Sequence, residues 1–151
     1  MAMKVFLGAD HGGFAAKEKI KKLFSEWGYE FEDLGAHTVD SGDDYPDYGF
    51  AVAKKVSENP EEHRGILFCR SGVGMDIVAN KVRGVHSAQV FNEDMARISR
   101  EKNNTSVLSI ATDYLSGAQI ESIVKTWLKT PFSGEERHVR RLKKIRDLER
   151  S

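Results

Sequence analysis

ILFCRSGVGMDIVANK, residues 66–81, is an apolar run followed by a loop with two glycines and then by a segment of helical character. The pattern predicts a buried strand, a tight loop and a helix. It places Cys69, the only cysteine, at the carboxyl end of the strand and beside the helix N-terminus. Backbone N–H groups and the helix dipole stabilise negative charge there, so they can lower the pKa of the thiol and hold an oxyanion. The alternative is that Cys69 fills the core and that Gly72 and Gly74 only turn the chain.

The length and the charge balance narrow the function classes. A chain of 151 residues is about the size of one domain, so we expect a single domain over residues 1–151. The 23 basic and 23 acidic side chains cancel, so no overall charge attracts nucleic acid or an anionic membrane. A lone cysteine excludes an intrachain disulfide and fits a reducing compartment, and no apolar run has the length of a signal peptide or a membrane span. We therefore expect a cytoplasmic protein that binds neither membranes nor nucleic acid.

Outward from residues 66–81, short apolar runs alternate with segments of helical spacing. Helices that follow the strands are marked by a stop at Gly28 and by Asn92 as an N-cap. Because parallel strands need crossover connections, the alternation predicts an α/β fold with a five-stranded parallel sheet and helices on both faces. The expected strands cover residues 4–9, 29–34, 65–69, 85–91 and 107–111.

The last segment, residues 134–150, has the pattern of a basic C-terminal helix. Arg137 and Arg141 stand four residues apart and share a face, and two guanidinium groups on one face suit a phosphate. Acidic residues nearby make a solvated charged face the simpler interpretation when this helix is taken alone. A nucleic-acid-binding helix is less favoured, since no aromatic side chains interleave with the basic ones.

A second polar loop is expected beside Cys69. Asp10 and His11 follow the first strand, and ligands of open parallel sheets bind outside the carboxyl ends of the strands. Asp10 can hold a hydroxyl group and His11 can donate to an anion, whereas the alternative is an ordinary turn with a surface histidine. Three familiar motifs are absent from residues 69–81. The Walker loop is missing altogether. The dinucleotide fingerprint would need glycine where Ile77 stands, and the phosphatase loop would need arginine where Met75 stands.

Taken together, six motifs resemble those of the ribose-5-phosphate isomerase B family, which also includes galactose-6-phosphate isomerase subunits. In order along the chain they are DHGGF (10–14), DYPDY (44–48), CRSGVG (69–74), ANK (79–81), NN (103–104) and GEERHVRR (134–141). The resemblance implies a Rossmann-like parallel sheet and a homodimer, or a tetramer, with active sites shared between subunits. It also implies a sugar-phosphate substrate, no metal and no organic cofactor.

The resemblance further implies an aldose–ketose isomerase that acts through a cis-enediolate. Such an enzyme needs a base, an oxyanion cradle and a phosphate anchor. By resemblance, Cys69 is the base and the backbone amides around Ser71, Gly72, Val73 and Gly74 form the cradle. The implied substrate contacts are Asp10 and Asn103 for hydroxyl groups, Tyr45 as a wall, His11 for the phosphate, and Arg137 and Arg141 for the phosphate from the partner chain.

The chain departs from the family pattern at three positions. Arg70 replaces a glycine, and it can contact the substrate, lower the pKa of Cys69 or point to solvent. Lys102 replaces the histidine assigned to opening the furanose ring, and His86 stands where arginine is frequent. Ribose 5-phosphate with ribulose 5-phosphate is the expected substrate pair. The alternatives are a hexose 6-phosphate of the allose or galactose type, or a non-catalytic sugar-phosphate sensor, which would not need Cys69.

Overall fold

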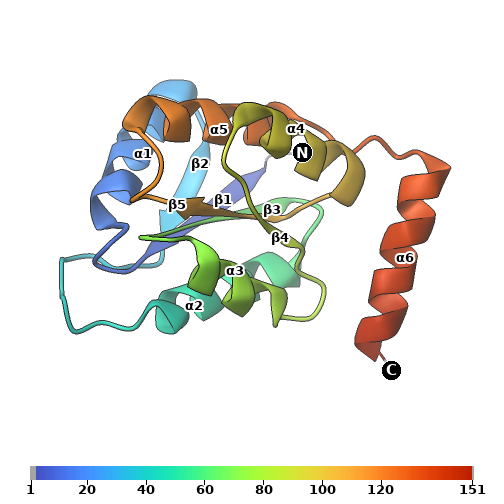
Figure 1. Cartoon of the computed structure of the whole chain (residues 1–151), viewed down its shortest axis with the longest axis horizontal. Helices are drawn as coiled ribbons and strands as arrows, with labels where there is room; N and C mark the ends of the chain where they lie inside the picture. The colour runs from blue at the N-terminus through green and yellow to red at the C-terminus, as the bar shows by residue number, and fades with distance from the viewer. Residues whose placement is uncertain (1–2, 151) are drawn as a thin grey trace.

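The computed structural model describes residues 3–150, which form one five-stranded sheet and six helices (Figure 1). All strand pairs are parallel, as predicted. In chain order the elements are β1 (Lys4–Ala9), α1 (Phe14–Trp27), β2 (Glu30–Asp33), α2 (Tyr45–Glu58), β3 (His63–Cys69), α3 (Val73–Asn80), β4 (Ser87–Gln89), α4 (Glu93–Asn103), β5 (Val107–Ala111), α5 (Gly117–Lys129) and α6 (Glu136–Arg150).

Helices cover both faces of the sheet, which confirms the predicted α/β class (Figure 1). Alternate residues of the central strands point to opposite faces. Leu7, Phe68 and Ile110 pack with α1, α4 and α5 on one face, where Trp127 is fully buried. Phe6, Leu67 and Cys69 pack with α2 and α3 on the other. The sulfur of Cys69 therefore belongs to the α2–α3 side of the core.

The expected strand over residues 85–91 is wrong in its extent, because only Ser87–Gln89 pair with β5. Val85 and Val90 are buried, but on opposite faces of the sheet. The N–H of Val85 donates to the carbonyl of Val82 in a turn at 3.1 Å, so it is not available to a strand ladder. The apolar run reflects burial at both ends of a short edge strand.

Two helix boundaries follow from local chemistry. Gly28 ends α1 in the left-handed region, and the side chain of Asn92 accepts the N–H of Met95 at 2.8 Å, as expected of a C-cap and an N-cap. The acidic segment 40–47 is only partly a loop, since α2 begins at Tyr45 with Pro46 in its first turn. Proline suits this position because a first-turn N–H has no helical partner.

The strand order β2-β1-β3-β5-β4 decides where a ligand can bind. β2 lies on one side of β1, whereas β5 and β4 lie beyond β3 on the other side. The loops that leave the carboxyl ends of β1 and β3 therefore run in opposite directions. Doubly wound sheets bind their ligands in the crevice that opens between two such loops. Asp10–His11 and Cys69–Gly74 are the segments that occupy it.

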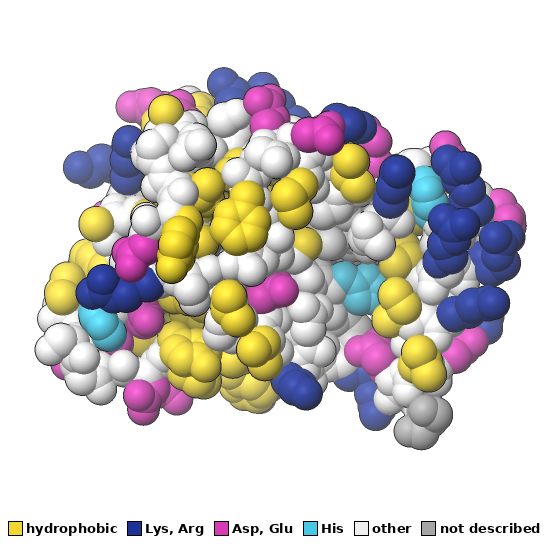
Figure 2. Space-filling view, viewed as in Figure 1, with side chains coloured by type: hydrophobic (Ala, Val, Ile, Leu, Met, Phe, Trp, Pro, Cys, Tyr) yellow, Lys and Arg dark blue, Asp and Glu magenta, His cyan; other side chains and the backbone are white. Residues whose placement is uncertain are grey.

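The last helix, α6, stands beside the sheet rather than on a face of it (Figure 1). His138 and Leu142 are its buried residues, and Glu149 accepts the N–H of Gly84 at 3.0 Å. Lys and Arg side chains crowd its outer side (Figure 2). The helix begins at residue 136, two residues later than expected, because Gly134 has a φ of +70°. Among residues 3–150, no helix combines the length and apolar composition needed to cross a bilayer.

Candidate active site

The two predicted loops meet in one cleft of about 380 Å³ at the carboxyl ends of β1 and β3. Its volume lies within the range of small-molecule sites. The convergence of these loops, which the sequence predicts from parallel-strand topology, is therefore confirmed as geometry. The cleft is lined by Asp10, His11, Tyr45, Cys69, Arg70, Ser71, Val73, Gly74 and Ile77.

Cys69 is the last residue of β3 and is 5% exposed. Its sulfur accepts the N–H of Gly72 at 3.1 Å. Burial raises the pKa of the Cys69 thiol, and this effect exceeds the opposing hydrogen bonds from the backbone amides of Met75 and Gly72. The backbone amides thus act on the thiol pKa in the direction that the sequence predicts, but burial decides the net shift.

Two glycines shape the loop for steric reasons. Gly72 has a φ of +74°, a conformation that L side chains rarely adopt, and it turns the chain from β3 into α3. A Cβ at Gly74 would lie 2.4 Å from the Tyr45 ring, so only glycine lets this ring approach the start of α3. Tyr45 accordingly forms a wall of the cleft, where the resemblance places it.

Two amides at the junction of β3 and α3 have local acceptors. Val73 donates its N–H to the Ser71 hydroxyl at 3.3 Å, and Gly72 donates to the Cys69 sulfur. The side-chain amide of Gln89 holds the carbonyl of Ser71. These contacts fix the loop at the N-terminus of α3, the end of a helix at which backbone N–H groups lack helical partners and can stabilise an anion.

The Asp10–His11 loop is held by side-chain hydrogen bonds. Asp10 is 8% exposed, and its carboxylate accepts the N–H of Gly13 at 3.1 Å. The Nδ1 of His11 lies 2.7 Å from Oδ1 of Asp43, a residue that the sequence analysis did not single out. Asp10, His11 and Asp43 also each offer a potential metal-ligand atom, all within 4.8 Å of one another.

Arg70 lines the cleft, but its side chain is 64% exposed and its guanidinium lies 3.6 Å from the carboxylate of Asp113. Burial is the main cause of the raised Cys69 pKa, and this guanidinium is not among its main causes. Of the three roles open to Arg70, a solvent-facing ion pair at the rim of the cleft fits this geometry.

Comparison with known proteins identifies the architecture around this cleft. A family model described as Ribose/Galactose Isomerase matches residues 5–145. The chain belongs to this isomerase family. It is 36% identical over 149 residues to ribose-5-phosphate isomerase B of Mycobacterium tuberculosis, covering 99% of this chain and 91% of the relative.

Solved structures of isomerase-family members agree with this assignment. Ribose-5-phosphate isomerase B of Mycoplasma genitalium, with bound ribulose 5-phosphate, matches with a TM-score of 0.96 and 37% identity over 100% of this chain and 99% of that one. The Clostridium thermocellum ribose-5-phosphate isomerase B structure matches with a TM-score of 0.92 and 40% identity, covering 98% of both chains. The predicted family resemblance and the Rossmann-like sheet are confirmed.

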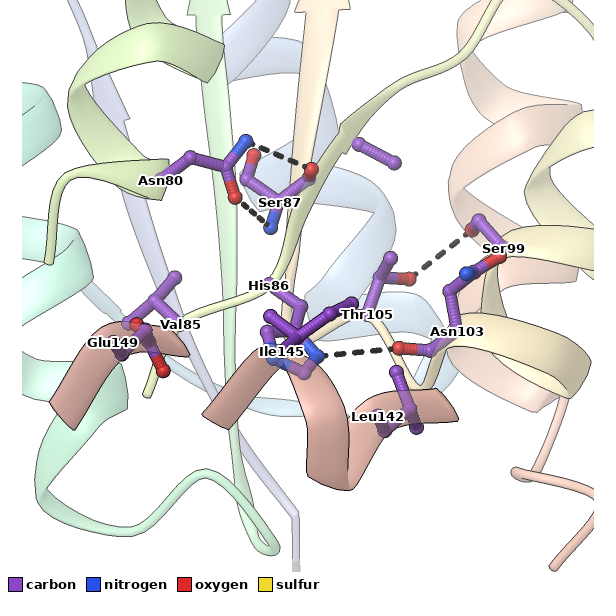
Figure 3. Close-up of a pocket in the computed structure, with 11 residues that line it drawn as sticks. Asn80, Val85, His86, Ser87, Ser99, Asn103, Thr105, Leu142, Ile145 and Glu149 are labelled. Carbon is purple, nitrogen blue, oxygen red and sulfur yellow. Dashed lines mark hydrogen bonds between the residues drawn. The ribbon is translucent and has the colours of Figure 1, made fainter. Parts of the chain in front are cut away.

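Two residues that the isomerase-family resemblance assigns to the site lie elsewhere in this chain. Lys102 and Asn103 are exposed at the end of α4, and the carbonyl of Asn103 accepts from Nδ1 of His86 at 3.3 Å. Asn103 lines a groove of about 340 Å³ between α6 and the sheet (Figure 3). This groove is at the amino ends of β4 and β5, whereas Cys69 is at the carboxyl end of β3. The length of β5, roughly 13 Å, separates the two edges.

The two predicted phosphate-binding arginines of α6 are also outside the cleft of their own chain. Arg137 is exposed, with its Nε 2.9 Å from Glu135, and Arg141 is exposed one helical turn later. Within one chain this surface matches the solvated charged face. A phosphate role for these isomerase-family residues therefore requires a second copy of the chain.

The raised pKa of Cys69 predicts how its thiol reacts. Alkylation by iodoacetamide requires the thiolate, so its rate in the folded protein should reach half of its plateau at a higher pH than in the same protein unfolded in urea. Mass spectrometry of the single cysteine gives both profiles. A folded midpoint at or below the unfolded one would show that the α3 N-terminus outweighs burial.

Proposed function

We propose that this protein is an aldose–ketose isomerase that interconverts ribose 5-phosphate and ribulose 5-phosphate, with Cys69 as the base. The observation that carries the proposal is the contact of the Cys69 sulfur with the α3 N-terminal loop, inside the cleft shared with Asp10 and His11. Membership of the ribose/galactose isomerase family supports the reaction class. The ribulose 5-phosphate bound to the Mycoplasma genitalium relative supports the pentose substrate.

The proposed reaction moves one proton between adjacent carbons. The Cys69 thiolate removes the proton from C2 of the open aldose, and the electron pair of that bond forms the C1–C2 double bond. Negative charge develops on O1, where the amides of residues 71–74 stabilise it. A proton passes from the C2 hydroxyl to O1, and the thiol returns its proton to C1. C2 is oxidised and C1 is reduced, so no external redox partner is needed.

The raised pKa of Cys69 has two opposite effects on this step. Less thiolate is present near neutral pH, but each thiolate is a stronger base than one with an ordinary pKa. The hydrogen bond from Gly72 to the sulfur links the two catalytic elements, because the same loop serves the base and the oxyanion.

The phosphate end of the proposed site needs residues from two chains. His11 lies in the cleft beside Cys69, whereas Arg137 and Arg141 face solvent on α6 of the same chain. A homodimer, or a tetramer built from such dimers, would bring the α6 arginines of one subunit to the cleft of the other. Lys102 and Asn103 would have to reach a cleft in the same way.

Purified protein should convert ribose 5-phosphate to ribulose 5-phosphate, and EDTA should not reduce the rate, because side chains and amides perform every step. Cys69→Ala should lower kcat by roughly 10²- to 10⁴-fold, the usual contribution of a positioned base. Met75→Leu, a volume-conserving change in the same core cluster, is the matched control and should stay within a few-fold of wild type.

If the protein converts no pentose phosphate and no hexose 6-phosphate, a non-catalytic sugar-phosphate sensor becomes the better account. Loss of activity with EDTA, restored by a divalent cation, would contradict the metal-independent mechanism and point to Asp10, His11 and Asp43 as its ligands. Near-normal turnover by Cys69→Ala would return Cys69 to a core-filling role.

Mixing two inactive variants tests the shared site. Cys69→Ala and Arg141→Ala subunits should each be inactive alone, but exchange between them should restore part of the activity, since a hybrid dimer contains one site with both intact residues. Native mass spectrometry of subunits of different mass verifies the exchange. Proven exchange without recovered turnover would place Cys69 and Arg141 in sites of the same chain.

A further inference from the structure

Asp43 is the buried partner of His11. It lies in the loop between β2 and α2, 32 residues from His11 along the chain. Its Oδ1 is 2.7 Å from the ring Nδ1 of His11 and accepts the backbone N–H of His11 at 3.2 Å. The Asp43 side chain is 5% exposed, whereas that of His11 is 27% exposed and lines the cleft.

The geometry points to Asp43 as a positioning residue for substrate phosphate: it accepts from Nδ1–H of the His11 ring and leaves Nε2 as the other ring nitrogen, which donates to the phosphate when it also carries a proton. The inference rests on the proposed function and adds to it a residue that the family motifs do not supply. Asp43 also interacts with the side chain of Tyr48, and it acts on the phosphate through His11.

The charge state of Asp43 decides the tautomer of His11. Burial would raise the pKa of the Asp43 carboxyl, but hydrogen bonds from the His11 side chain and backbone and from the Tyr48 side chain outweigh it, and the pKa lies below its usual value. Asp43 is therefore a carboxylate near neutral pH. A carboxylate only accepts hydrogen bonds, so Nδ1 of His11 must carry a hydrogen.

The same pair favours a dianion in the cleft. The Asp43 carboxylate is buried, and its charge is compensated first by His11 and then by the side chain of Tyr48. When Nε2 also carries a proton, the ring is a cation held between the Asp43 carboxylate and the phosphate. Such an arrangement gives the charge-assisted hydrogen bonds that hold phosphate most strongly.

The double contact also fixes the direction of the ring. Because Asp43 accepts from both the backbone and the ring of His11, rotation about the side-chain bonds of His11 would break the ring contact and leave a buried carboxylate with less compensation. A histidine anchored in this way is already oriented before phosphate binds, so less conformational entropy is lost on binding.

Three variants separate positioning from general stability. Asp43→Ala removes the acceptor, and Asp43→Asn keeps the shape and one acceptor oxygen but removes the charge. Asp40→Asn removes a charge from the same loop at an exposed residue whose oxygen accepts from Gly42, a role that asparagine retains, and it is the matched control. Circular dichroism and urea unfolding verify that each variant is folded.

The first readout is the tautomer itself. ¹⁵N NMR of histidine-labelled protein at pH 8.5, with the His11 signals assigned from His11→Asn, should show the Nδ1–H form in wild type and Asp40→Asn. Asp43→Ala should shift His11 toward the Nε2–H form that free imidazole side chains favour, and Asp43→Asn should show a mixture. An unchanged Nδ1–H signal in Asp43→Ala would overturn the inference.

The second readout is phosphate affinity. Calorimetric titration with inorganic phosphate should show a Kd about tenfold higher in Asp43→Ala than in wild type, in line with the loss of one charge-assisted contact. KM for ribose 5-phosphate should rise by a similar factor, with kcat within about threefold of wild type. A fall in kcat at unchanged KM and unchanged phosphate Kd would instead place His11 at the reacting carbons and overturn the phosphate assignment.

Failure of the proposed function is distinguishable from failure of this inference. A wild-type protein that isomerises nothing still reports the tautomer by NMR and the phosphate Kd by calorimetry. Conversely, an active isomerase in which Asp43→Ala leaves the tautomer, the phosphate Kd and KM unchanged would keep the proposed function and remove Asp43 from it.

Discussion

The turn that follows Cys69 is the constraint on which the rest of the site depends. Gly72 takes a positive φ, its N–H donates to the Cys69 sulfur, and α3 starts at the next residue. Since β3 lies between β1 and β5, this turn is held from both sides of the sheet. The thiol, the helix N-terminus and the wall formed by Tyr45 therefore share one small region whose geometry a single glycine conformation sets.

The neighbouring loop is fixed to this turn by close backbone contacts. A Cβ at Gly13 would lie 2.3 Å from the carbonyl oxygen of Phe68, so the start of α1 rests directly on the end of β3. The hydroxyl of Thr112, just after β5, lies 3.1 Å from the carbonyl of Gly12 and 3.2 Å from that of Cys69. Asp10 and His11 are thereby held beside the thiol by contacts to the backbone, which leave the side chains of His11 and Cys69 to the cleft.

How much the sequence predicted depended on whether a feature was local or long-range. The strand over residues 107–111, the Gly28 C-cap and the Asn92 N-cap were predictable because propensity, burial and capping are encoded within a few residues. The pairing of Asp43 with His11 was not, because 32 residues separate them and an acidic loop gives no sign of which carboxylate is buried. The net pKa shift of Cys69 was not predictable, because a helix N-terminus is visible in a sequence, whereas the degree of burial is a property of packing. The extent of β4 was misjudged because burial of Val85 and Val90 produces the same apolar run as a full strand.

The central claim is that Cys69 transfers a proton from carbon inside this cleft, and isotope exchange during turnover tests it most directly. Ribulose 5-phosphate is incubated with the protein in D₂O, and the ribose 5-phosphate formed is analysed by ¹H NMR. A thiol base that exchanges with solvent predicts deuterium at C2 of the product, and Cys69→Ala should form neither product nor deuterated ketose. Deuterated ribose 5-phosphate formed by Cys69→Ala at close to the wild-type rate would contradict the role of Cys69 as the base.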